Sequence, residues 1–95
     1  MTKTTSENDV ESHLTSECEK AGFLCYKFVC PGYNGVPDRI VIGNGHTVFV
    51  ELKAPGEQPR KLQVYRMKEI ERRGGHTRVI DTIQKVDDFI SELKS

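Results

Sequence analysis

Two acidic residues and one lysine stand out because their charges interrupt a segment that is otherwise apolar. Glu51 and Lys53 lie two positions apart in the run Thr-Val-Phe-Val-Glu-Leu-Lys, and Asp38 follows Pro37 thirteen positions before Glu51. Paired carboxylate oxygens suit a hard divalent cation such as Mg2+ or Mn2+, which polarises a phosphodiester and lowers the pKa of its water. A lysine beside them can orient or help deprotonate that water, or offset negative charge in the transition state.

An ordinary structural role is the alternative for these three residues. They would then be exposed side chains of a hairpin, with Glu51 and Lys53 forming a weak surface ion pair. A lone Glu-x-Lys in a strand favours that interpretation. The combination with an upstream Pro-Asp, in a strand that is otherwise apolar, favours the chemical one.

A predicted β-hairpin would bring the three charges together. We expect strands over 38–42 and 47–53, joined by a tight Gly-Asn-Gly turn. Side chains alternate along a strand, so Glu51 and Lys53 share a face and the leucine between them points into the core. Antiparallel pairing across the turn places Asp38 opposite Glu51.

Hydrophobic spacing and chain breakers predict the other elements, in the order αβββαβα. Ser6 can cap a first helix whose apolar stripe of Val10, Leu14, Cys18 and Ala21 ends at Gly22. A strand over 23–29, a helix over 60–73, a strand over 77–81 and a helix capped by Thr82 follow. The expected fold class is α/β, with a mixed sheet flanked by helices.

Length and charge limit the possible classes of protein. A chain of 95 residues predicts a single domain over 1–95, with 1–5 frayed. Fourteen basic residues balance fourteen acidic ones, so the net charge does not indicate a nucleic-acid partner. Between residues 53 and 73, however, there are seven basic residues and only three glutamates. Such a local excess of positive charge can bind phosphate.

Cysteines and apolar runs predict the compartment. The three cysteines form no CxxC pair and no zinc-finger spacing, so we expect reduced, largely buried thiols. The first eight residues are polar, and the longest apolar run is too short to span a bilayer. We therefore expect a cytoplasmic protein, in its host or in an infected cell.

Two motifs carry a resemblance to a known family. The stretch Gly-Val-Pro-Asp-Arg at 35–39, followed by Val-Glu-Leu-Lys-Ala-Pro-Gly at 50–56, resembles the VRR-NUC (virus-type replication-repair nuclease) family of the PD-(D/E)xK superfamily. The similarity extends through Gln63 and through the strand that follows Gly74-Gly75, so it covers most of the chain. It implies a restriction-endonuclease-like core and a deoxyribonuclease that depends on Mg2+ or Mn2+.

The resemblance also implies roles for individual residues. Asp38 and Glu51 would be metal ligands, the backbone carbonyl of Leu52 a third ligand, and Lys53 the catalytic lysine. Taken alone, Gln63 could equally be a solvated helix residue, but the resemblance favours a catalytic role in which it contacts that lysine, a metal-bound water or a phosphate. A stand-alone domain of this length resembles phage members that act as homodimers on branched DNA such as four-way (Holliday) junctions; fused versions occur in DNA-repair nucleases.

The family uses a further acidic residue on its first helix, and two positions compete for it. Glu11 lies eleven positions before Gly22, as the corresponding glutamate does in similar archaeal junction resolvases. Glu7 matches a glutamate that VRR-NUC sequences often show further upstream. We predict Glu11 as catalytic residue and metal ligand, because it lies at the edge of the apolar stripe and can reach the rim of the sheet without burying a charge in the core.

The leading hypothesis is a metal-dependent DNA endonuclease acting on branched or structured DNA. A non-catalytic DNA-binding or assembly module with the same fold is the alternative from another class, although the complete set of Asp38, Glu51 and Lys53 speaks against it. A restriction-like nuclease with sequence preference is a third hypothesis, which the short chain disfavours. None of these hypotheses requires a membrane.

Overall fold

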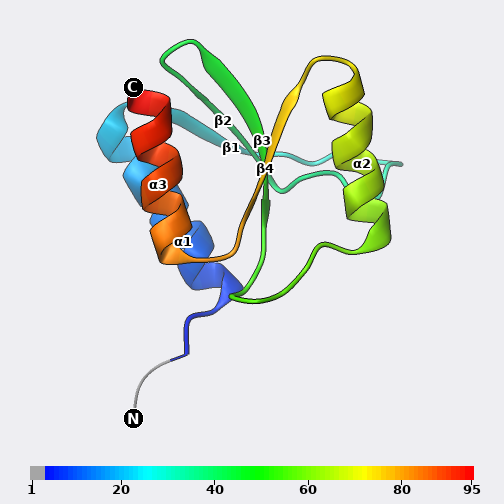
Figure 1. Ribbon diagram of the computed structural model, residues 1–95, viewed down its shortest axis with the longest axis horizontal. Coiled ribbons are helices and arrows are strands. Elements are labelled where there is room, and N and C mark those ends of the chain that lie inside the picture. Colours follow the sequence, from blue (N-terminus) through cyan, green and yellow to red (C-terminus); the bar gives the residue numbers. More distant parts are fainter. Residues whose placement is uncertain (1–3) are drawn as a thin grey trace.

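A computed structural model of the chain describes residues 4–95 and contains the predicted elements in the predicted order (Figure 1). The predicted fraying over 1–5 falls partly on residues 1–3, which lie outside the described residues; Thr4 and Thr5 precede the first helix. The elements are α1 (Glu7–Ala21), β1 (Leu24–Lys27), β2 (Arg39–Gly43), β3 (His46–Leu52), α2 (Lys61–Arg72), β4 (His76–Ile80) and α3 (Ile83–Lys94).

The four strands form one mixed sheet in the order β1-β2-β3-β4. The first three pair antiparallel, whereas β4 pairs parallel to β3 and is reached through the crossover helix α2. In Figure 1, α1 and α3 lie together on one side of the sheet and α2 lies on the other. The prediction of a mixed sheet flanked by helices is therefore confirmed.

The main core lies between the sheet and the pair α1 and α3. Val10, Leu14 and Cys18 of the predicted stripe of α1 are buried there, together with apolar residues of α3, and the alternate residues of the strands meet them. Of the three cysteines, all of which are free thiols, Cys18 is buried and the other two are partly buried. The buried cluster consists of Val10, Leu14, Cys18, Val41, Val48, Val50, Leu52, Ile80, Val86, Phe89, Ile90 and Leu93.

The start of α1 is fixed by a capping box. The Ser6 hydroxyl accepts a hydrogen bond from the Asp9 amide at 3.1 Å, and the Asp9 carboxylate accepts one from the Ser6 amide at 2.8 Å. Gly22 ends the helix in the left-handed conformation, with φ 77°. These caps fix where α1 begins and ends, and so place Glu7 in its first turn.

The turn between β2 and β3 fixes the register of the hairpin. Asn44 and Gly45 both have positive φ, 49° and 81°, as a two-residue turn that matches the twist of the strands requires. Arg39 pairs with Val50. One further step of the same register brings Asp38 opposite Glu51, as predicted.

Small differences from the predicted boundaries occur at strand ends. Asp38 precedes β2 instead of opening it, although its carbonyl oxygen still accepts a hydrogen bond from the Phe28 amide at 2.8 Å. β1 is shorter than the predicted 23–29. Among residues 4–95 no helix is long and apolar enough to cross a membrane.

Candidate active site

Glu51 and Lys53 are buried side by side at the end of β3. Their exposed fractions are 1% and 9%, and Lys53 Nζ lies 3.6 Å from Glu51 Oε2. Charged side chains are rarely buried to this extent without a functional or ion-pairing role. The interpretation of these residues as a solvent-exposed hairpin pair is therefore wrong.

Asp38 is joined to this pair through the backbone. Its Oδ2 accepts a hydrogen bond of 2.8 Å from the amide of Leu52, the residue between Glu51 and Lys53. Leu52 turns its own side chain into the core, as predicted. The predicted role of the Leu52 carbonyl as a ligand stays a prediction, because the contact that the structure gives is made by its amide.

The surroundings of Glu51 destabilise its ionised form. Burial, and next the nearby charge of Asp38, raise the pKa of Glu51 to about 7, although Lys53 opposes both effects. One oxygen of Glu51 already faces Lys53. The other, Oε1, is a buried side-chain oxygen that has no hydrogen-bond partner among the described residues.

A divalent cation fits this donor set. Burying a carboxylate oxygen without a partner costs roughly 1–3 kcal/mol or more, and a cation would supply the missing partner. Asp38, directly before β2, and Glu51 on the neighbouring β3 have carboxyl groups that interact electrostatically. The residues present therefore suit a hard metal ion bound between the two strands.

The two candidate acids of α1 have different surroundings. Glu11 forms an ion pair with Arg39, whose Nε lies 3.3 Å from the Glu11 carboxylate. Glu7 instead responds to the site: partial burial raises its pKa, and Asp38 is the next largest cause. The charge of Glu7 also contributes to the raised pKa of Glu51. The structure thus brings Glu7 toward the site and directs Glu11 to Arg39.

One signal in the sequence points to this arrangement. Arg39 follows Asp38 directly, so alternation sends its side chain to the opposite face of the sheet, which α1 covers. A guanidinium between sheet and helix needs an acidic partner, and Glu11 is in place to provide it. Hydrophobic periodicity alone does not show that Arg39 needs an acidic partner on α1.

Gln63 has a structural role at the start of α2. Its side-chain oxygen accepts a hydrogen bond of 2.8 Å from the Arg60 amide, which otherwise lacks an intrahelical partner. It is buried, and it lines a cavity of about 490 Å3 together with Arg60 and the loop residues Asn34 and Gly35. Within the described chain it has no hydrogen bond to Asp38, Glu51 or Lys53, so its predicted catalytic contact stays a prediction.

Known proteins share both the sequence and the fold of this chain. No family model matches. A protein of Acyrthosiphon pisum secondary endosymbiont phage 1 with the name "Putative nuclease p44" is 54% identical over 59 residues, which are 61% of this chain and 63% of that protein. A solved structure described as a "VRR_NUC domain" superimposes with a TM-score of 0.83 and 28% identity, and the match covers 92% of this chain and 96% of the other. In sequence and in fold the chain is similar to VRR-NUC proteins.

The likeness to a VRR-NUC domain confirms the resemblance that the two motifs carry. The VRR-NUC fold is restriction-endonuclease-like, and the family is one of nucleases, whose fold implies a divalent metal ion. The chain spans about 63% of the length of the phage relative that it matches.

The raised pKa of Glu51 predicts a pH-dependent stability of the metal-free protein. Its ordinary value is 4.5 and its value in the fold is about 7. Below pH 4.5 the carboxyl is protonated in both the folded and the unfolded state, so it has no effect. As pH rises from 4.5 to 7 the folded state retains a proton that the unfolded state has lost, and stability falls. Above pH 7 the penalty is complete, about 3 kcal/mol.

Glu51→Gln should therefore raise the free energy of unfolding at pH 8 and leave it nearly unchanged at pH 4. Urea denaturation in the presence of EDTA measures both values. Glu19→Gln, which removes an exposed carboxylate of α1, controls for the loss of one negative charge. Equal effects of Glu51→Gln at the two pH values would contradict the prediction.

Proposed function

We propose that this chain is a divalent-metal-dependent DNA endonuclease that hydrolyses phosphodiester bonds. Its active site would consist of Asp38, Glu51 and Lys53. The observation that carries the proposal is the buried Glu51, with one oxygen beside Lys53 and the other without a partner. A fold has no structural reason to bury a carboxylate in this state, and a metal ion removes the penalty. The family and the name of the phage relative support the same conclusion.

Each residue of the site has a proposed task. Asp38 and Glu51 hold a Mg2+ or Mn2+ ion together with the carbonyl of Leu52, and the Leu52 amide keeps the Asp38 carboxylate in place. When bound, such an ion would polarise the phosphodiester and lower the pKa of water. Lys53, held near Glu51 in a partly water-excluded position, orients the attacking water or offsets the charge that develops on phosphate.

Glu7 completes the acidic set in this proposal, in place of Glu11. Its pKa responds to Asp38 and Lys53, whereas Glu11 is committed to an ion pair with Arg39. Glu7 stands in the first turn of α1. Glu7 can therefore approach a cation from the helix side of the sheet.

The proposed substrate is branched or structured DNA such as a four-way junction. The basic residues between 53 and 73 belong to the segment that follows β3 and includes α2, so the sequence joins them directly to Glu51 and Lys53 of the site. Phosphate contacts by arginine and lysine supply most of the affinity of proteins that read DNA shape.

A homodimer is part of the proposal, because cutting both strands of a junction requires two sites. Leu24 and Ile42 are cross-strand partners on the sheet face opposite α1 and α3, and Tyr26 lies on the same face next to Ile40. Tyr26 is 58% exposed, and α2, which covers this side, packs on β4 at the far edge. Exposed apolar side chains gathered on one face suit contact with a second copy.

A cleavage assay tests the activity. The purified chain with Mg2+ or Mn2+ should cut four-way junctions and flaps, and Lys53→Ala should reduce the rate roughly 100-fold or more. Lys94→Ala, which removes an exposed lysine of α3, should leave the rate unchanged. Tight DNA binding without cleavage under any metal condition would contradict the proposed nuclease activity. It would favour the non-catalytic DNA-binding module instead.

Glu7→Gln and Glu11→Gln should have different effects. Loss of the Glu7 carboxylate is expected to weaken Mn2+ binding and cleavage roughly tenfold or more. Loss of the Glu11 carboxylate removes a partly exposed ion pair and should change mainly stability, by up to about 1 kcal/mol. Isothermal titration with Mn2+ and urea denaturation separate the two effects, and the reverse pattern would return the role to Glu11.

The dimer face is tested by charge insertion. Tyr26→Glu should shift the chain from dimer to monomer in analytical ultracentrifugation, because dimerisation would bury an unpaired carboxylate. Tyr65→Glu, at an exposed position of α2, is the matched control and should remain dimeric. If the Tyr26→Glu variant remains a dimer, the dimer interface lies on another surface of the protein.

A further inference from the structure

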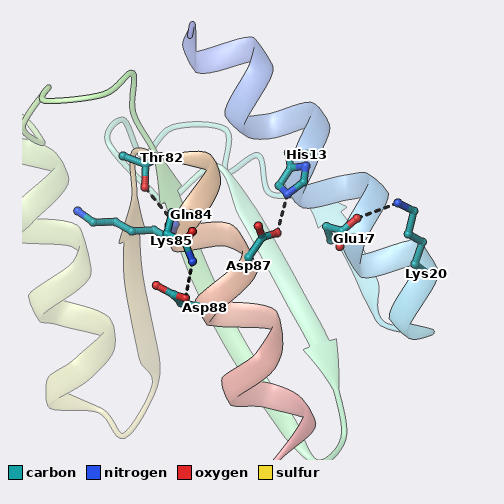
Figure 2. A network of polar contacts seen from close by, with 8 residues as sticks. All are labelled: His13, Glu17, Lys20, Thr82, Gln84, Lys85, Asp87 and Asp88. Carbon is teal, nitrogen blue, oxygen red and sulfur yellow. Dashed lines mark hydrogen bonds and ion pairs between the residues drawn. The ribbon is translucent and has the colours of Figure 1, made fainter.

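A second group of potential metal ligands lies away from the proposed catalytic site. His13 and Glu17 belong to α1 and Asp87 to α3, and one donor atom from each lies within 4.8 Å of the other two. His13 Nε2 is 2.7 Å from Asp87 Oδ1. Figure 2 shows the imidazole reaching across the helix pair to Asp87, with Glu17 on the same side of α1.

The backbone holds these three side chains in a fixed relation. His13 and Glu17 are four residues apart and so share one face of α1. Each helix is anchored immediately beside the group, since Leu14 follows His13 and Val86 precedes Asp87, and both are fully buried. The three ligands therefore project from two packed helices and not from a mobile loop.

The chemistry of the donors selects the kind of ion. One imidazole nitrogen with two carboxylate oxygens suits Zn2+ and related first-row ions, whereas Mg2+ prefers oxygen ligands only. A tetrahedral zinc ion with bonds of about 2.1 Å separates its donors by roughly 3.4 Å. His13 and Asp87, now 2.7 Å apart, would therefore move slightly apart, and Glu17 would move toward them. All three remain partly or fully open to solvent, which permits that shift and leaves a position for water.

We propose that His13, Glu17 and Asp87 form a zinc site that clamps α1 to α3. The ion takes the place of the hydrogen between His13 and Asp87 and adds Glu17 to the same link. Lys20, whose Nζ lies 3.0 Å from Glu17 Oε2, occupies one oxygen of that carboxylate and leaves the second for the ion. Because α1 also carries Glu7, the clamp stabilises the helix that borders the catalytic site.

The test uses Zn2+ alone on a chain in which the catalytic carboxylates are neutralised by Asp38→Asn and Glu51→Gln. The thermal midpoint should rise with Zn2+ concentration and not with equal concentrations of Mg2+, since an ion that binds only the folded state stabilises it. In the same background, His13→Gln and Asp87→Asn should abolish the Zn2+-dependent rise. Glu19→Gln, an exposed acid on the same helix, should retain it.

Cobalt spectroscopy identifies the ligands directly. Co2+ bound at this site should show visible absorption without the thiolate charge-transfer band that cysteine ligands produce, and His13→Gln should remove the absorption. A rise in midpoint that survives His13→Gln, a thiolate band, or no response to Zn2+ would each overturn the proposal and leave His13 and Asp87 as a simple ion pair. These results do not depend on nuclease activity, so the zinc site and the proposed function fail or stand separately.

Discussion

The hydrogen bond from the Leu52 amide to the Asp38 carboxylate is the contact on which the candidate site depends. It joins the two arms of the hairpin at the position where regular pairing ends, and it acts on the residue between Glu51 and Lys53. The turn at Asn44 and Gly45 sets the register that makes it possible. A slip of one residue would send Glu51 into the helix-covered core and Leu52 out of it.

The bond between Asp38 and the Leu52 amide keeps the Asp38 carboxylate close to Glu51, although the two negative charges repel each other. Burial and the neighbouring Asp38 both oppose the ionised form of Glu51, and Lys53 offsets only part of the penalty. A domain of 95 residues has a modest core with which to offset this strain. The apolar cluster between the sheet and the pair of α1 and α3 is therefore what maintains the acidic group in its unfavourable surroundings.

The sequence predicts most of the fold because its signals are local. Ser6 and Gly22 bound the first helix, the Gly-Asn-Gly turn sets the hairpin, and apolar periodicity identifies both helices that cover the core. The positions of Asp38, Glu51 and Lys53 follow from strand alternation. The choice between Glu7 and Glu11 does not, because it depends on which acid Arg39 engages across the interface of sheet and helix. The environment of Gln63 could not be predicted from the sequence either. Its burial and its hydrogen bond from the Arg60 amide depend on where α2 begins.

The parallel pairing of β3 with β4 has a consequence for how the protein folds. The Lys53 amide donates to the Ile80 carbonyl oxygen at 3.0 Å, across a crossover that includes the whole of α2. The hairpin that carries both carboxylates is local and closes fast, whereas contacts of such long sequence separation form slowly. During synthesis the acidic pair thus forms before the lysine is anchored. A chain released before β4 is complete would hold the carboxylates without a fixed ammonium beside them, so assembly of the site is coupled to completion of the fold.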